Sequence, residues 1–93
     1  MVVGLITWEL HLDGCRSLKE KRHVLKSLKD RLHNRFNVSA AETAHHDLWQ
    51  RAELTACVVS NERGHAESVL QEADRLVETA AGARIVDTST SFL

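Results

Sequence analysis

The sequence contains no proline, and only four of its 93 residues are aromatic: Trp8, Phe36, Trp49 and Phe92. Proteins that stack RNA bases on a sheet use two or three aromatic side chains on its central strands, so this composition argues against that mode. The chain also lacks an apolar run of the roughly 18–20 residues that a membrane span needs. No basic segment precedes the first apolar stretch, and Glu9 and His11 interrupt it, so a signal peptide is not predicted.

Cysteine is scarce as well, because Cys15 and Cys57 are the only two and fit no metal-binding or redox spacing. Without a secretion signal, we expect both thiols to be reduced in a cytoplasmic protein that does not associate with membranes. Cys57 lies in an apolar run, which predicts a small buried side chain.

The length of the chain allows one small domain, which covers residues 1–93. A domain of this size buries only about 60–65% of its unfolded surface, so its stability is modest and a partner surface is compatible with its size. The net charge of −1 at pH 7 excludes a uniformly basic nucleic-acid binder.

Four segments have the alternation or β-rich composition of strands: residues 2–12, 37–43, 51–60 and 83–90. A capping box predicts that a helix begins at Ser17. In such a box the Ser17 hydroxyl accepts hydrogen bonds from first-turn amides, and the Glu20 carboxylate accepts one from the Ser17 N–H. This helix is expected to run to about Phe36. A second helix carries an apolar stripe from Ala66 to Ala80 and is expected to be closed by Gly82.

The resulting order is β-α-β-β-α-β, which predicts an α+β, ferredoxin-like sandwich. Each βαβ half needs a right-handed crossover, and two such halves interlock as a four-stranded antiparallel sheet with both helices on one face. Trp8 is expected in the core. The opposite sheet face is expected to be largely polar, with Thr7, Glu9, Glu53, Thr55 and Asp87 diluted by Leu5, Val59 and Ile85.

Positive charge is concentrated on the first helix. Residues 16–36 carry eight basic and two acidic side chains, a net charge of +6, so the rest of the chain carries −7. At about 100° per residue, one flank of the buried stripe gathers five side chains within an arc of roughly 80°. We call this flank the basic edge, and it consists of Lys19, Arg22, Lys26, Lys29 and His33.

The second helix carries an acidic flank, formed by Glu67, Asp74 and Glu78. Because the two helices run antiparallel over the sheet, both charged flanks are predicted to point outward, to opposite edges. A basic edge of this density can track a phosphate backbone without specifying a sequence, and it can equally meet an acidic protein surface. The alternative is a charged helix face that is only solvated.

Two further cations, Lys21 and Arg35, fall inside the apolar arc of the first helix. Their long stems can carry the charges to the rim of the core. Alternatively, Lys21 points to the sheet edge and meets a carboxylate, for which Asp47 is a candidate.

No constellation of catalytic or metal-binding residues emerges, so we expect neither an enzyme nor a cofactor. The loop Asp13-Gly14-Cys15-Arg16 lacks both the paired cysteines of heavy-metal carriers and the glycine-rich phosphate cradle of acylphosphatases. The neighbours His45, His46 and Asp47 have no remote ligand pair to complete a metal site. The densest remaining cluster is a candidate contact patch, formed by Asp47, Trp49, Gln50 and Arg51.

Three blocks of the sequence resemble the bacterial YlxP-like family, a small family of unknown function. The blocks are Ser17-Leu-Lys-Glu-Lys-Arg22, Arg35-Phe-Asn-Val-Ser39-Ala-Ala-Glu42 and Asp47-Leu-Trp-Gln-Arg-Ala52. The resemblance spans nearly the whole chain and implies a ferredoxin-like fold and a gene neighbourhood of translation-initiation and ribosome-maturation factors. It implies no agreed activity and no catalytic residues. The chain departs from the family in its first loop, where a proline is common and Asp13-Gly14-Cys15 stands here, which bears only on the shape of the loop.

Two hypotheses for the function follow. The first is a non-enzymatic accessory protein of translation or ribosome maturation, which contacts ribosomal RNA or a ribosomal subunit through the basic edge. The scarcity of aromatic residues directs this hypothesis toward the RNA backbone. The second is a homodimeric protein-interaction module without nucleic-acid binding, which uses the sheet face that the helices leave uncovered.

Overall fold

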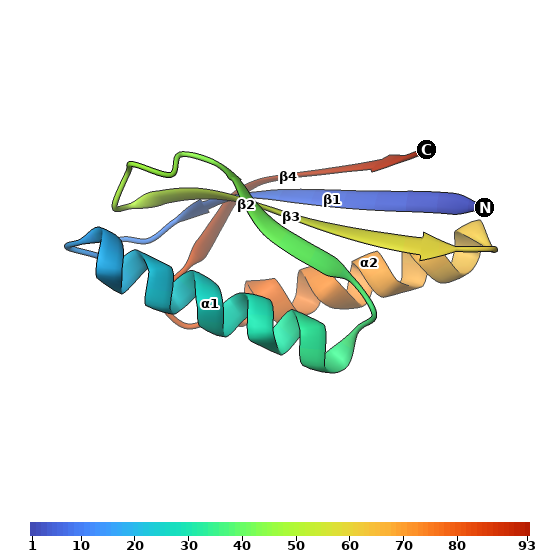
Figure 1. The fold of residues 1–93 in the computed structure, drawn as a ribbon, viewed down its shortest axis with the longest axis horizontal. Helices are drawn as coiled ribbons and strands as arrows, with labels where there is room; N and C mark the ends of the chain where they lie inside the picture. The colour runs from blue at the N-terminus through green and yellow to red at the C-terminus, as the bar shows by residue number, and fades with distance from the viewer.

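The chain forms a four-stranded antiparallel sheet with two helices on one face, as seen in the computed structural model, which describes residues 1–93 (Figure 1). Its elements are β1 (Val2–His11), α1 (Leu18–Arg35), β2 (Ser39–Ala44), β3 (Arg51–Ser60), α2 (Arg63–Glu78) and β4 (Arg84–Phe92). The strands lie in the order β2-β3-β1-β4, so β1 and β3 form the centre of the sheet. This topology confirms the predicted ferredoxin-like fold. Neither helix is long and apolar enough to cross a membrane.

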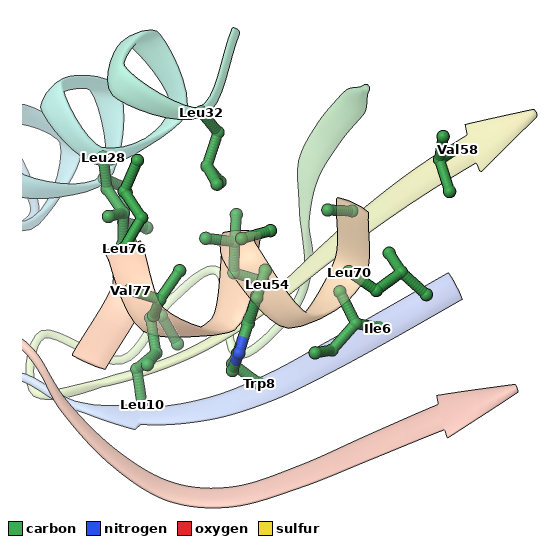
Figure 2. Packing of buried hydrophobic residues seen from close by; sticks show 14 of the residues in the cluster. Ile6, Trp8, Leu10, Leu28, Leu32, Leu54, Val58, Leu70, Leu76 and Val77 are labelled. Carbon is green, nitrogen blue, oxygen red and sulfur yellow. The ribbon is translucent and has the colours of Figure 1, made fainter. Parts of the chain in front are cut away.

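The core lies between the sheet and the helices. Every second residue of β1 and β3 points toward the helices, because successive side chains of a strand alternate between its faces. Figure 2 shows Ile6, Trp8 and Leu10 of β1 packed beneath the apolar stripe of α2. Gly4 permits this close packing, since a Cβ atom there would lie only 3.1 Å from side-chain atoms of Leu70 and Phe92.

The ends of the helices differ in two details from the expected caps. The N–H of Glu20 donates to Ser17 Oγ as predicted, but the Glu20 carboxylate accepts from the N–H of Arg16 and not from that of Ser17. Helix α2 ends at Glu78, and Gly82 lies beyond it in the following turn with a φ of 85°. The prediction that Gly82 closes the helix is therefore wrong, although its left-handed backbone does favour glycine.

Two residues lie on faces other than those expected. A bulge in β4 makes Glu9 pair with Asp87 but Leu10 with Ile85, so Ile85 packs against the core instead of lying on the uncovered sheet face. We call that uncovered face the open face. Cys57 lies on it, paired with Leu5 and only half-buried, whereas Cys15 is the buried cysteine. The expectation of a buried Cys57 is wrong because Ala56 and Val58 take the inward positions of β3.

Candidate functional site

The basic edge lies on the outer flank of α1, away from α2. Val24, on the opposite flank, lies against Gly82 in the turn that follows α2. The side of α1 that faces the sheet is identified by Lys21, because Lys21 contacts Glu42 of β2. Helical periodicity then directs the basic edge outward, toward the β2 edge of the molecule.

Most of the basic edge has no intramolecular partner. Only Lys26 forms an ion pair, with Asp30 one turn later at 2.8 Å. The hydrogen bond from Lys26 lowers the pKa of Asp30. Lys19, Arg22 and Lys29 form no salt bridge. An exposed pair of this kind contributes little to stability because solvent screens it, so Lys26 can exchange Asp30 for an external anion at little cost.

The acidic flank of α2 is more strongly engaged within the molecule. Asp74 Oδ1 accepts a hydrogen bond from the indole Nε1 of the buried Trp8 at 2.8 Å, and Glu67 pairs with Arg63 at 3.0 Å. Glu67 and Asp74 both line a shallow groove between α2 and β4. The acidic flank therefore lies on the β4 side, opposite to the basic edge, which agrees with the predicted arrangement.

Lys21 is buried and connects α1 to the sheet. Its Nζ lies 2.8 Å from Glu42 Oε2 and donates to the carbonyl oxygen of His45 at 2.6 Å. Of the two alternatives for Lys21, the contact with a carboxylate is therefore the one found, because the side chain does not extend to the rim of the core. The candidate partner Asp47 is wrong, since Asp47 lies on an exposed loop and Glu42 takes its place. Glu42 Oε2 is buried without a hydrogen bond of its own, and the adjacent ammonium compensates its charge. The alternation of β2 could have revealed Glu42, since it shares the inward face with Ala40.

The loop between β2 and β3, residues 45–50, is fixed from several sides, and we call it the Trp49 loop. Figure 1 shows it rising from the sheet on the side away from the helices. His45 has a φ of 64°, and its carbonyl accepts from Lys21 and from the N–H of Leu48. The His45 ring Nε2 lies 2.7 Å from Glu9 Oε1. The Gln50 amide donates to the carbonyl of Cys15 at 3.2 Å, so both ends of the loop are anchored.

The predicted contact patch lies on this loop and at its exit into β3. Its four residues line a shallow hollow of about 560 Å³, together with His11 and Leu48. Trp49 is 52% exposed, whereas Trp8 is fully buried. Arg51 is held by Glu9 at 2.7 Å. The structure thus brings the patch together as one surface, but keeps it separate from the basic edge, which belongs to α1.

The remaining groups that could take part in chemistry are the cysteine, histidine and carboxylate side chains. No three His, Cys, Asp or Glu side chains gather closely enough to hold a metal ion. A second hollow, of about 630 Å³, lies at the first loop and includes Cys15 and His23 in its lining. Burial raises the pKa of the Cys15 thiol, so the thiol is protonated at neutral pH.

Comparison with known proteins identifies the family. Residues 3–90 match the model of the family described as Protein of unknown function (DUF503). The chain belongs to this family. A relative from Bacillus subtilis (strain 168), named Uncharacterized protein YlxP, is 40% identical over 70 residues, which cover 75% of this chain and 76% of the relative. The YlxP-like resemblance of the sequence is thereby confirmed.

Solved structures agree with the fold of this DUF503 chain. The de novo designed protein Foldit4 matches with a TM-score of 0.57 at 7% identity, over 100% of this chain and 97% of the design. The designed protein LFR1 1, described as having a ferredoxin fold, matches with a TM-score of 0.54 at 15% identity, over 100% of this chain and 83% of the design. At these identities the likeness establishes the fold alone.

Proposed function

We propose that the protein is a non-enzymatic accessory factor of translation or ribosome maturation in the cytoplasm, and that it contacts RNA backbone through the basic edge of α1. One observation carries this proposal: four Lys and Arg side chains share the outer flank of α1, and only Lys26 is paired within the molecule. Cationic side chains that approach phosphates release condensed counterions, which drives association. The resemblance to the YlxP-like family, with its neighbourhood of translation factors, directs the proposal to ribosomal RNA.

The geometry of α1 suits a backbone contact. Lys19 and Lys29 are ten residues apart, or about 15 Å along the helix axis, so the flank spans several phosphates of one strand. The four cations present no fixed pattern of paired donors and acceptors, so the contact would position the protein without reading a base sequence. The acidic flank on the far side of the molecule would orient it, because that side is repelled by phosphate.

The experiment is cosedimentation with purified ribosomal subunits at low and high salt. The basic-edge variant, Arg22→Glu with Lys29→Glu, should lose an association that the wild-type chain shows at low salt. The inner-flank variant, Arg31→Glu with Arg35→Glu, is the matched control, because it makes the same change of charge on another face of the same helix. Retention of binding by the basic-edge variant, or equal loss in both variants, would contradict the proposal.

A competing proposal is a homodimeric protein-interaction module that does not bind nucleic acid. One observation favours it: Val59 is 62% exposed on the open face, where it pairs with Val3 of β1. This proposal predicts a dimeric mass by analytical ultracentrifugation, and a Val59→Lys variant that sediments as a monomer. A monomeric wild-type chain would exclude it.

A further inference from the structure

Trp49 is an exposed indole on a loop that the rest of the molecule holds in place. It is 52% exposed, and its neighbour Leu48 is 45% exposed. Tryptophan is enriched at interfaces, because its indole combines a large apolar surface with a polar N–H. Because the loop is ordered before binding, a ligand would not have to meet the entropy cost of immobilising it.

The contacts that fix the loop also join it to the helix that bears the basic edge. Lys21 donates to the carbonyl of His45 at 2.6 Å, and it stands between Lys19 and Arg22 along α1. In Figure 1 the loop and the N-terminal end of α1 lie at the same end of the molecule. Because the loop lies on the other face of the sheet, an RNA strand that follows the basic edge to the start of α1 would reach the Trp49 loop by crossing the β2 edge of the sheet.

The surroundings of Trp49 favour a single nucleobase over a protein as the binding partner. Apart from Leu48 and Trp49, the hollow is lined by His11, Asp47, Gln50 and Arg51. The adjacent open face continues as hydroxyl and carboxylate groups, with Thr43 bonded to both Thr55 and Glu53. A stable protein interface buries about 800 Å² per partner around an apolar core, for which this area offers too few apolar side chains. A nucleobase can stack its flat face on the indole and form hydrogen bonds through its polar edges with the polar residues that line the hollow.

We propose that Trp49 stacks an unpaired base of an RNA whose backbone lies along the basic edge. This inference rests on the proposed function and adds a second contact to it. Single-stranded nucleic acids are commonly held in this way, by a positively charged track together with an aromatic side chain on which a base stacks. The contact would favour RNA with unpaired bases over a continuous duplex, whose bases are already stacked.

The test uses tryptophan fluorescence, because Trp49 is the only exposed tryptophan and Trp8 is buried. The probe is an RNA hairpin with an unpaired adenosine-rich loop, compared with a fully paired duplex of the same stem sequence. Titration with the hairpin should quench the emission of the wild-type chain, while the remaining Trp8 emission of Trp49→Ala should be unaffected. Trp49→Ala should weaken hairpin binding about ten-fold or more, and duplex binding far less. Trp49→Phe, which keeps an aromatic ring, should retain most of the affinity.

The outcomes separate this inference from the proposed function. If Trp49→Ala binds the hairpin as tightly as the wild type while the basic-edge variant does not, the stacking contact is wrong and the backbone contact stands. If the wild-type chain binds neither RNA, both are wrong. If Trp49→Ala binds the hairpin normally but no longer cosediments with ribosomal subunits, Trp49 contacts protein and the inference is overturned.

Discussion

The Lys21 ammonium lies in the interior, where a charge costs several kcal/mol unless a partner and hydrogen bonds compensate it. Glu42 and the carbonyl of His45 supply both, so one side chain fixes β2 against α1 and holds the start of the Trp49 loop. The sequence placed Lys21 within the apolar arc but suggested Asp47 as its partner. The alternation of β2 was the signal that could have identified Glu42, because it puts Glu42 on the inward face with Ala40, whereas Asp47 lies beyond the strand on the loop.

Replacing Lys21 with Met should lower the free energy of unfolding by about 3 kcal/mol, because it leaves the buried carboxylate of Glu42 without compensation. The double variant Lys21→Met with Glu42→Gln should recover part of this loss, since it also removes the buried charge. Urea denaturation of both variants and of Glu42→Gln alone measures these differences. A Lys21→Met variant within about 1 kcal/mol of the wild type would show that the pair does not stabilise the fold.

The two cysteines should differ in their reactivity toward a thiol reagent such as Ellman's reagent. Cys57 is half-buried on the open face and should react first, whereas Cys15 is buried and its pKa is raised by that burial. Cys57→Ser should remove the fast phase alone. A fast phase that persists in Cys57→Ser would contradict the burial of Cys15.

The raised pKa of Cys15 also predicts a dependence of stability on pH. The native chain holds the thiol proton more tightly than the unfolded chain, so this contribution is constant below the ordinary pKa of 9.0 and falls as the pH rises beyond it. Stability measured by urea denaturation from pH 8 upward should therefore fall less steeply in Cys15→Ala than in the wild type. Parallel curves for the two proteins would contradict this assignment.

At the scale of elements, the hydrophobic periodicity of the sequence was sufficient to predict all six elements, and together with the topology it predicted the outward direction of the basic edge. Periodicity could not predict the bulge in β4, because the extra residue changes which side chains face inward without changing the composition of the strand. Ile85 is inward and Val86 outward for that reason. Gly82 was correctly predicted to break the chain direction, but it does not end the helix, since α2 ends at Glu78 and is capped by Thr79.

Helix α2 is joined to β1 by the hydrogen bond from Trp8 to Asp74, so one residue of the acidic flank has a structural role. Asp74→Ala should lower the free energy of unfolding by about 1–3 kcal/mol, because it leaves the buried indole N–H without an acceptor. Asp74→Asn keeps a hydrogen-bond acceptor and should lower the free energy of unfolding by less than Asp74→Ala does. Glu67→Ala, on the same flank but bonded only to Arg63, is the control and should change stability by less than about 0.5 kcal/mol. Equal losses from Asp74→Ala and Glu67→Ala in thermal unfolding would contradict this role.

At the scale of the whole molecule, the net charge of −1 conceals a separation of charge between two edges. The cations of the basic edge are largely free, while Asp74 and Glu67 of the opposite flank are engaged within the molecule. This separation could be predicted from the sequence, because helical periodicity and the topology together define the two outward flanks. The sequence placed Trp49 in a candidate contact patch, but only the folded loop shows that its anchors leave the indole outside the core.

The central claim, that the basic edge contacts RNA backbone, is tested most directly by the salt dependence of binding to a ribosomal RNA fragment. Four phosphate contacts should give the logarithm of the association constant a slope of about −3 against the logarithm of the salt concentration. The basic-edge variant should weaken binding and reduce the magnitude of this slope by about 1.5–2, while the inner-flank variant should keep the wild-type slope. The same slope in all three proteins, or no binding by the wild type at low salt, would contradict the account.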